Sequence, residues 1–315
     1  MSFSMFGASV LTIASAASPS FFFLISLNFL KGMTITGLSA VALAYLSEEV
    51  SVESLGFVIS LYLSGNILGG MLGRVVAGLF SSWLGWRAAT LFIGLLGFAL
   101  AVAFQRVLPK SQNFERQNIK PAQKLRQMKQ FLFRPGLLSL FALGALLMGI
   151  FVSSYNYLNY RLEAPPFSLP HYLIAFVYVM YIAGIAGSML AGRWSDSYSP
   201  VDILRVLLIV LIVGLFFLLS GFIWTLTFGL GLLTFGFFGA HTMASRMVSL
   251  SVEAGTSTAV SLYWLFYYTG SSVIGTASGA LLPAWGWTVF IYTLIGLGGV
   301  SLIISFFSHD SGGSN

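Results

Sequence analysis

The stretch that decides the fold is SLYLSGNILGGMLGRVVAGLFSSWLGWR, residues 60–87. It contains six glycines and an internal arginine in an otherwise apolar run that is long enough to cross a membrane. After proline, glycine is the residue that least favours a helix, so its repetition needs a structural reason. In lipid, helices associate through close packing of small residues, because burying apolar surface against a neighbour gains little there. The stretch therefore predicts a membrane helix with a closely packed glycine face.

The composition of the whole sequence also indicates a membrane protein. Its 315 residues are 57% hydrophobic and 8% charged, whereas about a quarter of the residues in a soluble domain are charged. The mean hydropathy is +0.90. The apolar runs lack the alternation of a barrel strand, so we expect an all-α membrane protein. Because the sequence has no cysteine, it has neither disulfides nor thiolate metal sites, and we expect no metal and no cofactor.

Turn residues and charges predict ten spans. The N-terminal residues lack the basic segment of a signal peptide, so we expect them to open the first span. The predicted spans cover about 1–17, 20–46, 55–81, 86–106, 136–160, 171–192, 202–223, 225–249, 256–282 and 286–307.

Basic residues concentrate in one segment between spans. Eight of the 15 Lys and Arg residues lie between Arg106 and Arg134, together with one acid, Glu115. By the positive-inside rule this segment faces the cytoplasm, as a solvated loop or as a lipid or partner site. Both termini then face the cytoplasm, and the charge indicates a membrane rather than nucleic acid. The predicted domains are a four-span half (1–105), a basic linker (106–134), a six-span half (135–309) and a polar tail (310–315).

The sequence also contains an internal repeat. A shift of 201 residues aligns Ser60-Leu61-Tyr62 with Ser261-Leu262-Tyr263, Gly69 with Gly270, Gly78 with Gly279, and Gly85-Trp86 with Gly286-Trp287. The third and ninth spans are therefore predicted copies, as in transporters that hold substrate between two related halves. By the same shift, the counterpart of the half that begins near Pro135 starts about 65 residues before Met1. About 65 residues, or two helices of a six-helix half, are therefore expected to be missing from this sequence, through a late start or a deletion.

Several motifs carry a resemblance to a known family. They are GWR at 85–87, YLSEE at 45–49, FGFFGAHTMAS at 235–245, and glycines spaced as G-x8-G-x3-G-P-x2-G-G at Gly56, Gly65, Gly69, Gly70, Gly73 and Arg74. Gly70 replaces the proline of the last motif and Arg74 its final glycine. The sequence resembles the major facilitator superfamily, and within it the proton antiporters that export drugs and sugars. The resemblance implies the major facilitator fold, here as helices 3 to 12 of the usual twelve, in a multi-pass protein of the inner membrane.

Three ionisable residues inside the predicted spans are candidates for proton coupling or substrate binding. Arg74 and Lys31 are costly in a bilayer and normally face the protein interior with a partner. Structural pairing of Arg74, for example with Glu163, is the alternative. His241 is the single histidine that we place in mid-membrane, and histidine exchanges protons near neutral pH. A structural hydrogen bond is the alternative for His241.

Aromatic and amide groups on three predicted spans are candidates for a substrate cavity. They could stack on, and hydrogen-bond to, a sugar or a flat amphipathic compound, although packing and the aromatic belts at the interfaces use the same residue types. The candidates are Tyr62, Asn66, Tyr155, Asn156, Asn159, Tyr263, Trp264 and Tyr267.

The segment AGRWSDSYSP, 191–200, resembles the cytoplasmic loop motif of the superfamily through Gly192 and Asp196. The resemblance implies that this aspartate helps to latch the cytoplasmic side. We therefore expect a secondary transporter that moves a small organic molecule by alternating access, with protons as the coupling partner. An inactive remnant without the upstream helices and an uptake symporter for sugars or organic acids are the alternatives. The sequence has no HExxH, G-x-S-x-G or phosphate-binding motif, so we do not expect an enzyme.

Overall fold

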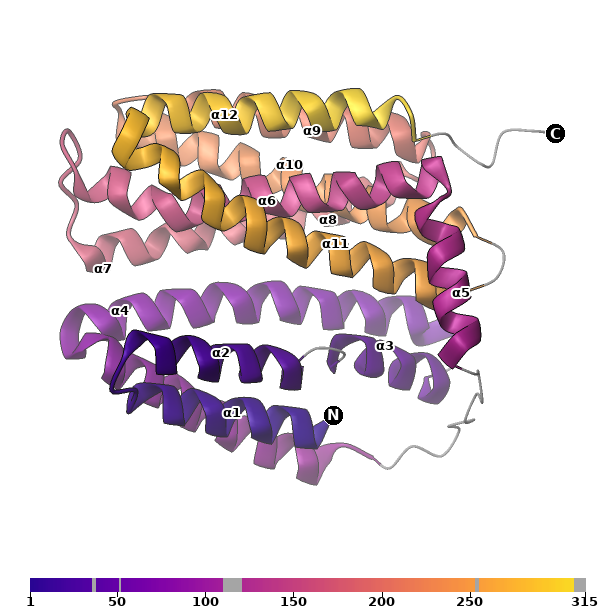
Figure 1. The fold of residues 1–315 in the computed structure, drawn as a ribbon, viewed down its shortest axis with the longest axis horizontal. Coiled ribbons are helices and arrows are strands. Elements are labelled where there is room, and N and C mark those ends of the chain that lie inside the picture. Colours follow the sequence, from indigo (N-terminus) through magenta and orange to yellow (C-terminus); the bar gives the residue numbers. More distant parts are fainter. Residues whose placement is uncertain (36–37, 51, 110–120, 253–254, 309–315) are drawn as a thin grey trace. The chain divides into compact units, whose positions relative to one another are not determined.

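The computed structural model describes residues 1–35, 38–50, 52–109, 121–252 and 255–308. All regular elements within these ranges are helices (Figure 1). The chain divides into two compact units. Unit 1 comprises Met1–Gln117 with Pro170–Val179, and unit 2 comprises Asn118–Leu169 with Met180–Asn315. The expected domain boundaries near residues 105, 134 and 309 stay predictions.

Unit 1 is built around one long helix. It contains α1 (Ser2–Ala16), α2 (Phe21–Ile35), α3 (Leu38–Glu49), α4 (Val52–Val107), α7 (His171–Ile174) and most of the 3₁₀ helix η1 (Ala175–Met180). The second part of α4 packs against α1 at Gly94, where a Cβ atom would lie 2.7 Å from Ile13. Near this contact, the rings of Phe6 and Phe98 meet edge to face with centroids 5.3 Å apart. A glycine thus lets two membrane helices approach closely, as expected in lipid.

Unit 2 contains the larger core. Its helices are α5 (Pro121–Leu132), α6 (Pro135–Glu163), α8 (Tyr181–Trp194), α9 (Pro200–Phe217), α10 (Ile223–Leu250), α11 (Thr256–Ala277), the 3₁₀ helix η2 (Ser278–Ala280) and α12 (Leu281–Ser305). Prolines at the first positions of α6 and α9 favour helix initiation there, because proline lacks the N–H group that a helix start leaves unpaired. Glycines again mediate the close contacts. A Cβ atom at Gly187 of α8 would collide with the carbonyl oxygen of Phe235 in α10.

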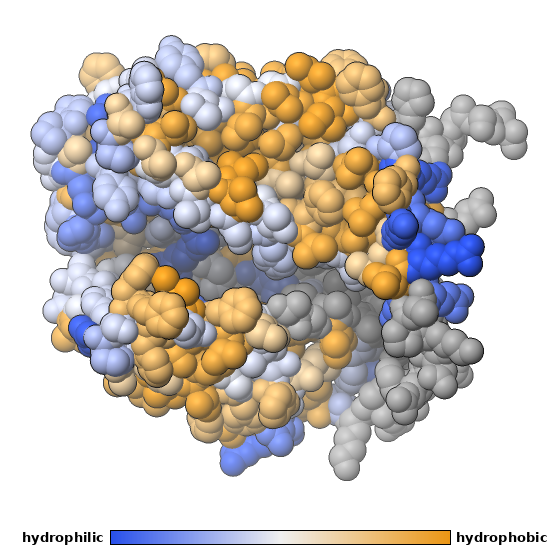
Figure 2. Space-filling model, viewed as in Figure 1, coloured by the Kyte–Doolittle hydropathy of each residue, from blue (hydrophilic) through white to orange (hydrophobic). Residues whose placement is uncertain are grey.

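The lengths of the helices match the thickness of a bilayer. In the described part of the chain, six helical segments are long and apolar enough to cross a membrane. Two of them, Ser64–Val107 and Thr256–Ser305, have 44 and 50 residues. At about 1.5 Å per residue, each is long enough to cross the roughly 30 Å core twice. Figure 2 shows apolar side chains over much of the visible surface, as expected for helices that face lipid.

Both long segments bend at a glycine with a positive φ angle. Gly85 has φ 82° and ψ 162°, and Gly286 has φ 74° and ψ −179°. This region of backbone space is essentially restricted to glycine. The two positions are related by the 201-residue repeat, so the structure confirms that the two helix pairs are built alike at this point.

The expected spans differ from the observed helices in three places. The span predicted over 202–223 ends at Phe217, where a turn leads into α10. The span predicted over 20–46 is described as α2 and α3, with 36–37 outside the described residues. The basic linker, expected as a loop, contains the helix α5 because charged and apolar residues alternate at helical spacing in Pro121–Leu132.

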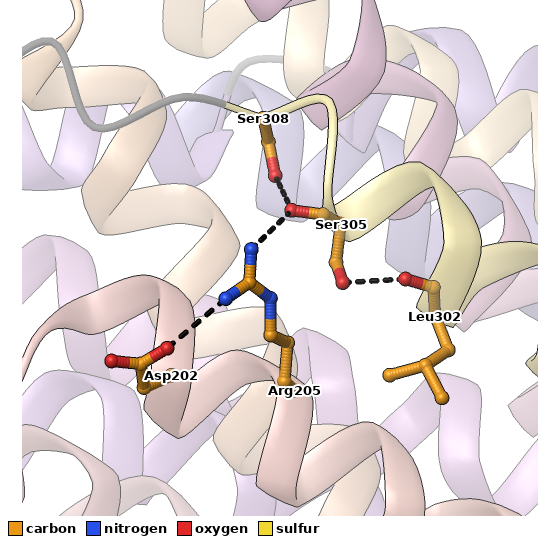
Figure 3. A network of polar contacts seen from close by, with 5 residues as sticks. All are labelled: Asp202, Arg205, Leu302, Ser305 and Ser308. Atoms are coloured by element: carbon orange, nitrogen blue, oxygen red, sulfur yellow. Dashed lines mark hydrogen bonds and ion pairs between the residues drawn. The ribbon is translucent and has the colours of Figure 1, made fainter.

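A polar network joins the start of α9 to the end of α12 (Figure 3). Arg205 pairs with Asp202 at 3.1 Å and reaches the carbonyl oxygen of Ser305 at 3.5 Å. The Ser308 hydroxyl donates to the same oxygen at 2.8 Å. These contacts place one end of each helix at the same boundary of unit 2.

Candidate functional site

A histidine and a tyrosine from adjacent helices form the centre of the candidate site. His241 Nδ1 of α10 lies 2.8 Å from the hydroxyl oxygen of Tyr263 of α11. The rings of Trp264 and Tyr267 surround the imidazole, with centroids 5.3 and 4.7 Å from its own. Tyr263 and Tyr267 share one face of α11 because residues four apart in a helix are neighbours. Four of the residues expected at a proton or substrate site thus lie together.

The surrounding packing holds this pair in place. Tyr263 is fully buried, and its ring lies so close to Gly144 of α6 that a Cβ atom there would be 2.7 Å away. Phe237, one turn before His241, stacks on the imidazole with centroids 6.1 Å apart. A neutral imidazole can either donate to the tyrosine oxygen or accept from it. The imidazole of His241 can therefore hold a proton while it keeps a hydrogen bond to the Tyr263 hydroxyl.

An aromatic cluster extends this site into the interior of unit 2. Phe151 stacks on Phe237 at 4.0 Å between centroids and also contacts Tyr155. Tyr181 of α8 meets Tyr155 edge to face at 5.1 Å. Sequence reasoning did not select Phe237 or Tyr181, although Phe237 lies four residues before His241, a spacing that places both on one helix face.

Tyr155 and the asparagines of α6 occupy different environments. The side chain of Tyr155 is 1% exposed, and its hydroxyl hydrogen-bonds with Thr234 Oγ1 at 2.8 Å. It therefore belongs to the packed interior in this structure. Asn156 is exposed and Asn159 is half-buried. The assignment of these side chains to a substrate cavity stays a prediction.

The candidates of unit 1 lie on two helices. Lys31 of α2 is half-buried, Tyr62 of α4 is half-buried, and Asn66 of α4 is exposed. Arg74 places its guanidinium carbon 5.3 Å from the ring centroid of Tyr178, a cation–π contact within unit 1. A structural partner for Arg74 was one of the two sequence interpretations, and Tyr178 supplies one.

The glycine motif of α4 has few close neighbours among the described residues. Among the described residues, no neighbouring atom lies within 4 Å of a Cβ atom built at Gly65, Gly69, Gly70 or Gly73. Gly78 alone of this stripe makes a close contact, at 2.7 Å from the Cβ atom of Ala175. Gly56 is helical, but its surroundings lie outside the described residues. Close packing of another helix along the whole stripe therefore stays a prediction.

The corresponding glycines of unit 2 are closely packed. A Cβ atom at Gly270 would meet the carbonyl oxygen of Ala145, and one at Gly279 would meet the hydroxyl of Tyr157. Both partners belong to α6. A shift of 201 residues assigns α6 no counterpart within this sequence. The repeat thus aligns Gly69, which has no described atom near an added Cβ atom, with the closely packed Gly270.

The loop motif lies at the end of α8. The Ser195 hydroxyl donates to the carbonyl oxygen of Gly192 at 2.6 Å, and Arg246 of α10 donates to Ser195 Oγ. The side chain of Asp196 is exposed. These bonds attach the loop to the end of α10. Within the described ranges, no three His, Asp or Glu side chains are grouped as metal ligands.

Comparison with known proteins decides the family. The profile of the Major Facilitator Superfamily matches residues 1–276. The chain belongs to the major facilitator superfamily. It is thus related to membrane transporters, and the all-helical fold with its long apolar spans agrees with this.

Three relatives within this superfamily are similar over most of the chain. YybF of Bacillus subtilis, an uncharacterized MFS-type transporter, is 38% identical over 287 residues, which cover 91% of this chain and 71% of that protein. The inner membrane transport protein YnfM of Escherichia coli is 33% identical over 280 residues, or 89% of this chain and 67% of YnfM. A probable sugar efflux transporter of Pasteurella multocida is 29% identical over 225 residues, or 69% of this chain and 50% of that protein.

A solved structure supports the same fold for this superfamily member. The nucleoside transporter NupG superposes with a TM-score of 0.74 at 14% sequence identity. The match covers 98% of this chain and 82% of NupG. The protein is therefore a multi-pass membrane transporter of the major facilitator type.

Proposed function

We propose that this transporter exports a small organic molecule across the inner membrane in exchange for protons, by alternating access, and that His241 carries the proton. The observation that supports the proposal is the 2.8 Å hydrogen bond between His241 Nδ1 and the Tyr263 hydroxyl. Both residues lie well inside α10 and α11, far from the helix ends. Histidine is the side chain whose unperturbed pKa, about 6.5, lies closest to physiological pH, which is why it is our candidate for the proton carrier.

The rings around His241 favour a flat or amphipathic substrate. Trp264 stacks near Tyr268 with centroids 5.7 Å apart, and Tyr268 is exposed. Indole and phenol rings bind planar apolar faces, and their N–H and O–H groups orient polar substituents. The similarity to a probable sugar efflux transporter supports export as the direction.

The sign of proton movement distinguishes export by antiport from uptake by symport. The gene product that contains this sequence is purified and reconstituted in vesicles that enclose a pH-sensitive dye at equal pH on both sides. Chloramphenicol, lactose or uridine is then added outside. For antiport, substrate entry drives protons out, and the interior becomes alkaline for whichever probe is transported.

The alternative functions predict other results. Interior acidification indicates a symporter, which the same fold also supports. No proton movement with any of the three probes contradicts proton-coupled transport of these compound classes. An inactive remnant stays the second alternative, and absence of exchange of every labelled probe would favour it.

A further inference from the structure

We propose that the outer face of α5 binds the headgroup of an anionic phospholipid at the membrane boundary. Arg126, Lys129, Gln130 and Phe133 line a hollow of about 510 Å³ in the surface of unit 2. These positions are spaced by three or four residues, so they share one face of the helix. The proposal concerns a ligand of the protein surface and does not depend on what the protein transports.

The opposite face of α5 holds the helix against unit 2. The Thr258 hydroxyl at the start of α11 donates to Gln127 Oε1 at 2.9 Å. Gln127 and Phe131 are half-buried, whereas Arg126 and Lys129 are exposed. The cationic face is therefore turned away from the unit and toward its surroundings.

The ends of three spans place α5 at the depth of lipid headgroups. Arg134 Nη1, directly after α5, donates to the carbonyl oxygen of Ser251 at 2.9 Å, just after the end of α10. At the same boundary, α6 begins at Pro135 and α11 begins at Thr256. Figure 2 shows hydrophilic side chains at the edge of the molecule where Figure 1 places α5. A helix that connects span ends at this level lies along the interface.

The chemistry of the face fits a lipid phosphate better than a free ion. Two cations attract a negative headgroup, and the Gln130 amide can donate to its oxygens. Leu125 is 68% exposed and Phe133 is 77% exposed, next to these cations. Apolar side chains beside a basic face are typical of helices that insert shallowly among acyl chains. Inorganic phosphate would leave these apolar groups in water.

Lipid retention in the full gene product tests this proposal. The protein is mixed with equal amounts of phosphatidylglycerol and phosphatidylcholine, and bound lipids are counted by native mass spectrometry. A basic residue near an anionic surface contributes about a fivefold increase in affinity. We therefore expect the double variant R126Q/K129Q to lose about 25-fold in phosphatidylglycerol retention, with phosphatidylcholine retention unchanged.

Two controls make the result specific. Lys124→Gln removes a cation from the same helix without touching the hollow, because Lys124 is exposed but does not line it. We expect less than a twofold loss for this variant. Equal losses in Lys124→Gln and R126Q/K129Q, or unchanged retention in both, would overturn the proposal. Displacement of phosphatidylglycerol by millimolar inorganic phosphate would overturn the lipid assignment, since it would identify phosphate alone as the ligand.

Discussion

Gly69 and Gly270 occupy equivalent positions of the repeat but have different neighbours. A Cβ atom at Gly270 would collide with the backbone oxygen of Ala145, whereas one at Gly69 meets no described atom within 4 Å. We expect Gly270→Ala to lower the free energy of unfolding by about 1 to 3 kcal/mol through overpacking. Gly69→Ala should be neutral or stabilising, by up to about 1 kcal/mol, because alanine favours a helix. Thermal unfolding in detergent measures both, and equal losses would contradict the assigned packing.

The sequence identified His241 as a candidate but not its partner. Tyr263 follows 22 residues later, on another helix, and only the packing of α10 against α11 brings its hydroxyl to the imidazole. The sequence indicated that burying the Arg74 charge in a bilayer costs free energy and that the side chain needs a partner. That the partner is Tyr178 follows only from the fold of unit 1. The sequence therefore identified ionisable residues that are costly to place in lipid, but it did not predict their partners on other helices.

At the scale of elements, the kink of α12 depends on one backbone conformation. Gly286 has φ 74° and no neighbour within 4 Å of an added Cβ atom, so any cost of a side chain there comes from the backbone alone. We expect Gly286→Ala to destabilise the protein by about 1 to 3 kcal/mol. Gly296→Ala in the same helix is the matched control, because it is equally open and lacks a positive φ. Equal losses of stability in Gly286→Ala and Gly296→Ala would show that the positive φ angle at Gly286 adds no cost for a side chain.

The elements were largely predictable because a bilayer permits few alternatives to long apolar helices. The 201-residue repeat aligns Gly85 with Gly286, and both residues have a positive φ angle at a helix kink. The helix α5 was missed because its many charges suggested a solvated loop. The glycine stripe of α4 predicts close packing but does not identify the partner helix, so its packing along Gly65, Gly69 and Gly73 stays a prediction.

For the whole molecule, the sequence predicts that the basic linker and both termini face the cytoplasm. Cysteine labelling can test this orientation, because this sequence has no cysteine of its own and each introduced cysteine is its only thiol. Ser197→Cys, in the turn after α8, should resist a membrane-impermeant maleimide added outside intact cells. Gly221→Cys, in the turn before α10, should react. Labelling of Ser197→Cys but not of Gly221→Cys would show the reverse orientation.

The measurement that tests the proposed mechanism most directly separates substrate exchange from proton movement in His241→Gln. Glutamine keeps a hydrogen-bonding group near Tyr263 but cannot carry a proton at neutral pH. In reconstituted vesicles we expect this variant to exchange labelled substrate across the membrane at no less than about a third of the normal rate. Its substrate-driven pH change should fall at least tenfold, whereas His171→Gln at the start of α7 should retain both activities. A normal pH change in His241→Gln would contradict the assignment of the proton to His241.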